Sequence, residues 1–148
     1  MPQVDMPLPD LEKYGGRNPK PADFDAYWNT AIAEMHARGT GCELIPNTTL
    51  ATPFAEAFDL YFTGVDGARV HAKYLRPKDA AAPHPAVLQF HGYTHHSGEW
   101  SEKLGYVARG FSVAALDCRG QGGMSEDKGG VRGNTHNGHI IRGLDDAP

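Results

Sequence analysis

Several features that would reveal the chemistry of a protein directly are missing from this sequence. No apolar run approaches the roughly 20 residues that a membrane-spanning helix requires. Residues 1–13 also lack the basic segment and apolar core of a signal peptide. The formal net charge is −4 and no basic stripe occurs, which argues against nucleic acid as a partner. We therefore expect neither a membrane protein nor a nucleic-acid-binding protein.

Cysteine is scarce, and the common nucleotide and nucleophile motifs do not occur. Cys42 and Cys118 are far apart and outside any Cys-x-x-Cys metal pair. We expect two free thiols, although spacing alone leaves a disulfide open. The sequence has no Gly-x-x-x-x-Gly-Lys-Ser/Thr loop and no dinucleotide fingerprint. Gly-x-Ser-x-Gly is also missing, and no serine sits in a strand-turn-helix elbow.

The first part of the chain predicts an extended arm and then a helix. Residues 1–21 are rich in proline and glycine without periodicity, so we expect an arm laid on the surface, followed by a single domain over residues 22–148. Apolar residues with helical spacing follow the arm, and we expect their shared face to pack into the core. Gly39 ends this helix. The stripe consists of Phe24, Tyr27, Trp28, Ala31 and Met35.

Alternating apolar and polar residues predict a β-hairpin next. The two strands cover residues 58–63 and 70–74, with Phe58, Leu60 and Phe62 on the buried face. The turn residues between them indicate an antiparallel pair. His71 falls on the polar face, so we expect it to be solvated.

A buried strand, a helix and a second buried strand follow. Residues 86–90 are apolar at nearly every position, as are residues 111–117, and helical spacing lies between them. This order predicts a βαβ unit with parallel strands. The fold class is therefore α/β, an antiparallel hairpin followed by a parallel sheet. Residues 118–148 are glycine-rich and predict loops that either line a site or lack the elements they should join.

The His91-Gly92-Tyr93 loop leaves the first buried strand where α/β enzymes place working backbone. Gly92 allows a tight turn, and the N–H of Tyr93 is a natural donor to the oxyanion of an acyl-transfer reaction. A plain strand-to-helix connection explains the same pattern equally well. Two neighbouring histidines, His95 and His96, also permit a metal site, but the loop context and the missing cysteine ligand disfavour it.

The segment after the second buried strand reads Asp117-Cys118-Arg119-Gly120-Gln121-Gly122. Arginine and glutamine held between glycines suit a buried hydrogen-bond network, because the guanidinium group offers five fixed donors. We therefore expect Arg119, Gly120 and Gln121 to support a site structurally rather than to perform its chemistry.

Taken together, these motifs resemble the N-terminal half of the acetyl xylan esterases and cephalosporin C deacetylases, carbohydrate esterase family seven. The resemblance implies an α/β-hydrolase fold, a Ser-His-Asp triad, and the deacetylation of xylo-oligosaccharides, cephalosporin C or other small acetyl esters. It also implies ring-like hexamers, no cofactor or metal, and a cytoplasmic location. The matching segments, in family order, are Met6–Leu11, Asp23–Trp28, Gln89–Tyr93, Asp117–Gly122 and Gly138–Asp146.

By position, Tyr93 matches the family's oxyanion residue through its backbone N–H, and Arg119-Gly120-Gln121 matches its Arg-Gly-Gln motif. The family's serine elbow, Asp and His would all lie beyond Pro148. We therefore expect an incomplete sheet whose strand at residues 86–90 needs the C-terminal half of the domain as its partner. No substrate-binding residue is identified.

A second class of function also fits part of the pattern. The aromatic residues Tyr93 and Trp100 and the missing nucleophile would suit a non-catalytic carbohydrate-binding or assembly module. The buried strands of the βαβ unit argue against it, because binding modules built as β-sandwiches do not show that pattern.

Overall fold

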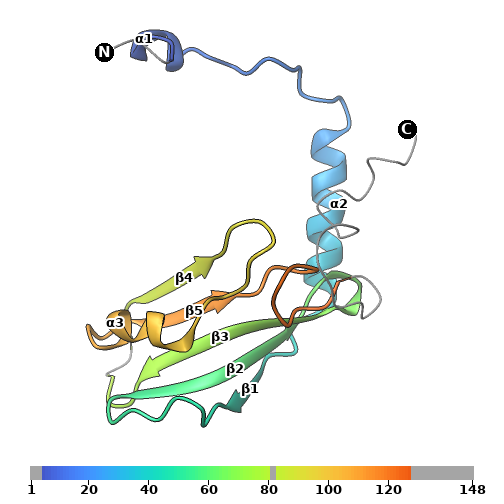
Figure 1. Cartoon of the computed structure of the whole chain (residues 1–148). Helices are drawn as coiled ribbons and strands as arrows, with labels where there is room; N and C mark the ends of the chain where they lie inside the picture. The colour runs from blue at the N-terminus through green and yellow to red at the C-terminus, as the bar shows by residue number, and fades with distance from the viewer. Residues whose placement is uncertain (1–4, 81–82, 128–148) are drawn as a thin grey trace. The chain divides into compact units, whose positions relative to one another are not determined.

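The computed structural model of the chain describes residues 5–80 and 83–127 (Figure 1). The chain divides into two compact units between Ala33 and Glu34. In the described part, no helix has both the length and the apolar character that crossing a membrane would take.

The first unit contains a short helix where the sequence predicts an extended arm. Helix α1, Leu8–Leu11, is a single turn that includes Pro9. A proline in the first turn of a helix is tolerated because the N–H that it lacks would have no intrahelical partner there. Proline content alone therefore did not exclude a helical turn.

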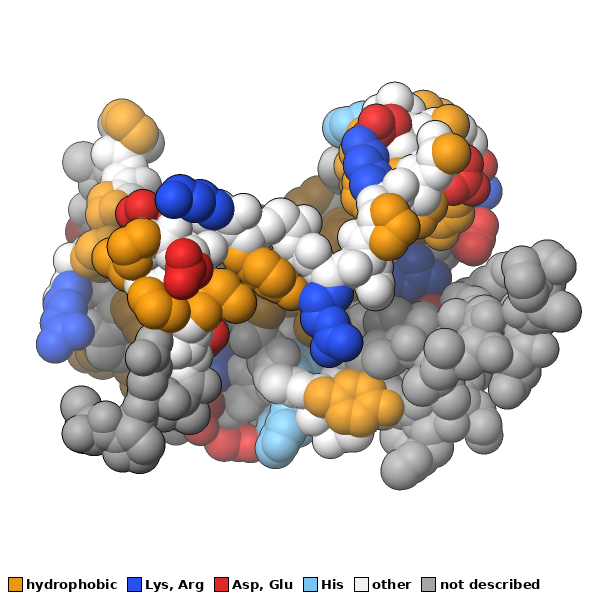
Figure 2. Space-filling model, turned by 90° about the horizontal axis from the view of Figure 1, so that it is seen from above, with side chains coloured by type: hydrophobic (Ala, Val, Ile, Leu, Met, Phe, Trp, Pro, Cys, Tyr) orange, Lys and Arg blue, Asp and Glu red, His pale blue; other side chains and the backbone are white. Residues whose placement is uncertain are grey.

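Helix α2, Phe24–Ala37, confirms the predicted helix, and Gly39 follows it with a φ of +66°. The packing of its apolar stripe into the core stays a prediction. Within α2 the aromatic rings contact one another, with Tyr27 edge-on to Trp28 at a centroid distance of 5.7 Å. Figure 2 shows hydrophobic side chains open to solvent among charged ones.

The second unit contains a five-stranded sheet in the order β1-β2-β3-β5-β4 (Figure 1). Strands β2 and β3 form the predicted antiparallel hairpin, and β4 and β5 the predicted parallel pair. The four-residue β1, which the sequence analysis did not predict, pairs with β2. The strands are β1 Glu43–Pro46, β2 Ala55–Thr63, β3 Arg69–Pro77, β4 Ala86–Phe90 and β5 Ser112–Leu116.

The crossover between β4 and β5 is helical, as the spacing predicts. It consists of a 3₁₀ turn η2, Trp100–Lys103, and the helix α3, Leu104–Val107. Glu99 and Glu102 form a reciprocal capping box at the start of η2. Gly110, with a φ of +86°, turns the chain into β5.

The hydrophobic core cluster lies under this crossover, on the face of the sheet opposite to Phe58, Leu60 and Phe62, while Val70 and Ala72 are buried on the predicted face. Val107 and partly buried Trp100 and Leu104 cover it, whereas Phe58, Leu60 and Phe62 are only half-buried on the other face. A face becomes the core only where another element covers it, and here that element is the crossover. The buried cluster comprises Ala55, Ala57, Leu75, Val107 and Val113.

The two edges of the sheet differ. β1 is short, ends in Pro46, and carries an ion pair between Glu43 and Arg69 at 2.7 Å, all features that discourage pairing with another strand. β4 has no strand on its outer side among the described residues. Its side chains Leu88 and Phe90 are each 69% exposed, so this edge is open and apolar.

Candidate functional site

The loop that leaves β4 presents an unused hydrogen-bond donor. Within the described part of the chain, the backbone N–H of Tyr93 has no acceptor, while its own side chain is exposed. His95 N–H closes a turn onto the carbonyl of Gly92 at 3.1 Å. The carboxyl end of a parallel strand is where α/β enzymes place such donors. The structure thus puts Tyr93 where the sequence analysis placed its oxyanion donor, and the role itself stays a prediction.

A side chain from the neighbouring loop holds the residue after Tyr93. The buried Gln121 accepts the N–H of Thr94 through its Oε1 at 2.7 Å. Thr94 adopts a φ of +67°, a conformation that a β-branched residue adopts only where its surroundings impose it. Gln121 therefore fixes the loop in a strained shape while leaving the Tyr93 N–H free.

The two other residues of the Arg-Gly-Gln motif shape the same loop. Arg119 lies with its Nη2 3.4 Å from Oδ1 of Asp127. Gly120 has a φ of +65°, which favours glycine. The motif thus turns the chain sharply and delivers Gln121 to the loop after β4, and its role in supporting a site stays a prediction.

Glycines bring the two loops into direct contact. A side chain at Gly122 would place its Cβ 2.7 Å from the carbonyl oxygen of Thr94, and one at Gly123 would overlap the carboxylate of Asp117. The N–H of Gly122 also donates to the carbonyl of His95 at 3.0 Å. Close approach, rather than flexibility, therefore explains these two glycines.

The carboxylate of Asp117, at the end of β5, links both loops to the sheet. Its Oδ1 accepts the N–H of Ser97 at 2.6 Å, and its Oδ2 accepts the N–H of Met124 at 3.0 Å and contacts Nδ1 of His71 at 2.6 Å. Burial by itself would raise the pKa of Asp117, but the hydrogen bonds from His71 and from the two N–H groups outweigh it. The pKa of Asp117 therefore lies well below its ordinary value, and its carboxyl group is ionised at neutral pH.

His71 is fully buried, so the expectation of a solvated histidine is wrong. Its second ring nitrogen, Nε2, lies 2.9 Å from Oδ1 of Asp59 on β2. The sequence pattern placed His71 and Asp59 correctly on one face of the hairpin, but it could not show that the crossover and the loop after β5 cover that face.

The rings of His91 and His96, two of the histidines of the β4 loop, make hydrogen bonds to the backbone. Nδ1 of His91 lies 2.7 Å from the carbonyl oxygen of Gly92, and its Nε2 accepts the N–H of Cys118 at 2.9 Å. Nδ1 of His96 accepts the N–H of Gly98 at 3.1 Å. Among the described residues, no group of three or more His, Cys, Asp or Glu could hold a metal ion. The predicted alternative of a metal site at His91, His95 and His96 has no geometric support.

Two cysteines and the buried Ser125 are further candidate nucleophiles in the described part of the chain. Both Cys42 and Cys118 are free thiols. Burial and the adjacent Asp117 carboxylate raise the pKa of Cys118, which disfavours the reactive thiolate. The buried Ser125 accepts the N–H of His71 at 2.8 Å through its hydroxyl oxygen.

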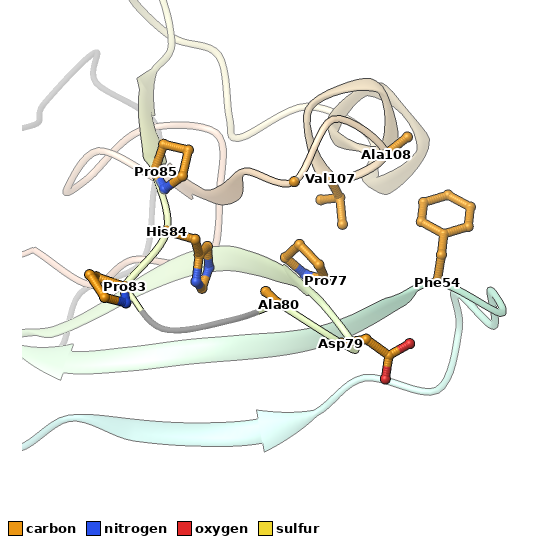
Figure 3. A pocket seen from close by; sticks show the side chains of 10 residues that line it. Phe54, Pro77, Asp79, Ala80, Pro83, His84, Pro85, Val107 and Ala108 are labelled. Carbon is orange, nitrogen blue, oxygen red and sulfur yellow. The ribbon is translucent and has the colours of Figure 1, made fainter.

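One serine–histidine pair lies at the opposite end of the sheet. Oγ of Ser112, at the start of β5, is 2.7 Å from Nε2 of His84. Ser112 is buried, and no carboxylate among the described residues contacts the His84 ring. His84 also lines a pocket of about 710 Å³, with Phe54 on one wall and Val107 of α3 and the following Ala108 on another (Figure 3). This pocket is separate from the Tyr93 loop, because it lies before β4 rather than after it.

A second hollow lies beside the candidate loop. Its volume is about 440 Å³, and it is lined in part by Phe90, His91, His96 and the buried Lys103. Tyr93 and its supports therefore sit next to a concave surface that includes the open edge of β4. The predicted family motif at residues 138–146 lies outside the described residues.

Comparisons with known proteins match the whole chain to one family. The family model of acetyl xylan esterase (AXE1) matches residues 1–148. The crystal structure of acetyl xylan esterase 1 from Thermoanaerobacterium sp. JW/SL YS485 is 58% identical with a TM-score of 0.81, over 97% of this chain and 44% of that one. An acetyl xylan esterase from Paenibacillus sp. R4 is 27% identical with a TM-score of 0.72, over 90% of this chain and 43% of that one. The chain thus spans less than half the length of either structure.

Proposed function

Because the chain belongs to the acetyl xylan esterase family, we propose that it supplies the oxyanion loop of a serine carboxylesterase that deacetylates xylo-oligosaccharides and cephalosporin C. The observation that carries the proposal is the free backbone N–H of Tyr93 at the carboxyl end of β4, beside the bonded N–H of Thr94. A rigid donor with no acceptor among the described residues suits an oxygen that gains negative charge during the reaction.

The proposed reaction uses this donor in both of its halves. A serine oxygen attacks the acetyl carbonyl carbon, and the carbonyl oxygen becomes an oxyanion that accepts the N–H of Tyr93. Collapse of this intermediate breaks the bond to the alcohol oxygen of the ester. That oxygen leaves as a free hydroxyl group of the substrate after a histidine passes it the serine proton. Water then attacks the acetyl-serine, and the same donor stabilises the second oxyanion before acetate leaves.

The serine elbow would come from a segment with the family's Gly-x-Ser-x-Gly motif, which these 148 residues do not contain. We propose that this C-terminal half of the domain pairs its strand with the open edge of β4. The exposure of Leu88 and Phe90 there supports the proposal, since unpaired apolar edges are normally covered.

Two further properties are proposed from the family. A homo-oligomer, such as a hexamer, is proposed on the family resemblance alone. The free thiols Cys42 and Cys118 support a cytoplasmic location, since oxidising compartments favour disulfides. The alternative of a non-catalytic carbohydrate-binding module gains nothing from a sheet with a parallel β4–β5 pair.

The test is ester hydrolysis by the natural polypeptide that contains these residues, with p-nitrophenyl acetate as substrate. Tyr93→Pro removes the proposed donor, and we expect kcat to fall by about 10²-fold or more. Tyr93→Phe keeps the backbone N–H and should retain kcat. Full activity in folded Tyr93→Pro protein would refute the role of this donor. Resistance of the wild-type activity to a serine-directed phosphonate would refute the proposed nucleophile.

A further inference from the structure

A single buried histidine joins two carboxylates from different parts of the fold. The His71 ring lies between Asp59 on β2, at 2.9 Å from Nε2, and Asp117 after β5, at 2.6 Å from Nδ1. Each ring nitrogen thus faces a carboxylate oxygen at hydrogen-bond distance. Hydrogen bonds to a carboxylate are stronger than those between neutral groups and fix the direction of both partners.

The far end of the network is anchored in β2 and the segment before it. Asn47 donates from Nδ2 to Oδ2 of Asp59 at 2.7 Å, and the oxygen of Asn47 accepts the N–H of Thr49 at 2.9 Å. The ring of Tyr61 packs on the imidazole with a centroid distance of 5.0 Å. The His71 ring is thus held by contacts to Asp59 and Tyr61 that do not involve Asp117.

The near end of the network holds the candidate loop. The Asp117 carboxylate accepts the N–H of Ser97 and of Met124 with different oxygens, so its rotation decides where both segments lie. Ser97 lies two residues after the turn Gly92–His95, and Tyr93 lies inside that turn. The backbone N–H of His71 adds a second tie, through Ser125.

We propose that His71 is a positioning residue for the esterase reaction: by orienting the Asp117 carboxylate, it holds Ser97 and thereby the N–H of Tyr93 toward the oxyanion. Asp59 orients the His71 ring in turn. This inference rests on the proposed function, because it assigns the network a role in that reaction. Neither His71 nor Asp59 touches the substrate.

The experiment uses the natural polypeptide that contains these residues, with any polypeptide that co-purifies. His71→Gln leaves one side-chain nitrogen in place of two. The matched control is His84→Gln, which removes a histidine–serine contact of 2.7 Å at the other end of the sheet. Asp59→Asn is a milder variant of the same shape on the part-exposed side of the network. If His71→Gln does not fold, the same measurements are made on Asp59→Asn.

Two readouts are needed. Steady-state hydrolysis of p-nitrophenyl acetate should show kcat about tenfold to a hundredfold lower in His71→Gln with KM within about twofold, because the geometry of the donor changes rather than substrate binding. Amide hydrogen exchange should be about tenfold faster at Ser97 in the same variant. His84→Gln should match the wild type in both measurements.

The outcomes separate this inference from the proposed function. If the wild type does not hydrolyse esters, the proposed function fails, while exchange at Ser97 still tests the physical link from His71. Wild-type kcat and wild-type exchange at Ser97 in a folded His71 or Asp59 variant would overturn the inference. A rise in KM with unchanged kcat would overturn it as well.

Discussion

The side-chain oxygen of Gln121 accepts the backbone N–H of Thr94 across 2.7 Å, and so joins the loop after β5 to the loop after β4. The two residues are 27 positions apart, and no local interaction would bring them together. Their hydrogen bond occupies the N–H that follows Tyr93 and leaves that of Tyr93 available.

Removing the acceptor at Gln121 should therefore impair the reaction without affecting substrate affinity. We expect Gln121→Ala to lower kcat about tenfold and leave KM unchanged, because a buried hydrogen bond of about 1 kcal/mol no longer fixes the loop. Gln121→Glu keeps an acceptor oxygen and should lose less activity. Equal loss in both variants, measured by ester hydrolysis, would contradict this explanation.

The depressed pKa of Asp117 predicts a specific pH dependence of stability. A carboxylate whose pKa is lower in the folded state stabilises the fold fully above its unfolded pKa, near 3.9, and loses that contribution as pH falls further. Asp117→Asn should thus be destabilised by about 3 kcal/mol at pH 7, and the difference from wild type should shrink below about pH 4.

Urea unfolding at a series of pH values, followed by tryptophan fluorescence, measures this difference. The contributions of the other carboxylates to the free energy of unfolding cancel in this difference, because both proteins contain them. A free-energy difference that does not change between pH 7 and pH 3 would show that the charge of Asp117 does not stabilise the fold.

Two glycines of the second unit should respond in opposite ways to alanine. Gly123→Ala would drive a methyl group into the Asp117 carboxylate, so we expect a loss of stability of about 1–3 kcal/mol. At Gly105, in α3, nothing lies within 4 Å of the added Cβ, and alanine should stabilise the helix by about 0.5–1 kcal/mol. Thermal unfolding of both variants tests the pair, and a stabilised Gly123→Ala would contradict the close packing.

The open edge of β4 predicts self-association of the isolated 148-residue chain. Leu88→Lys should reduce this association, because a charge on an edge strand discourages strand pairing. Leu44→Lys, on the protected edge strand β1, is the control and should change it little. Analytical ultracentrifugation measures the effect, and a compact monomer of the unmodified chain would contradict the prediction.

Local patterns in the sequence predicted most elements of the sheet. The alternation at residues 58–63 and 70–74 identified the hairpin, and the apolar run Ala86–Phe90 identified a strand beside the site. The short β1 was missed because four residues are too few to show a period. The covered face was misassigned because alternation defines two faces without saying which one the crossover covers.

The site was predictable only in part, for a similar reason. Tyr93 and the Arg-Gly-Gln motif were singled out because glycines and a preceding buried strand mark such loops. The role of His71 was missed because Asp117 lies 46 residues away along the chain. The sequence did contain a signal for this pair. Asp59 and His71 fall on the same face of the predicted hairpin, and an acid and a histidine on neighbouring strands of one face suggest an ion pair.

The register of the hairpin also bears on the order in which the site assembles during folding. Asp59 and His71 are only 12 residues apart, whereas His71 and Asp117 are separated by 46. Hairpins close within microseconds, and contacts between distant segments form later. We therefore expect the acid–histidine pair to form before β5 arrives, and the capture of Asp117 to follow it and to order the loop that carries Tyr93.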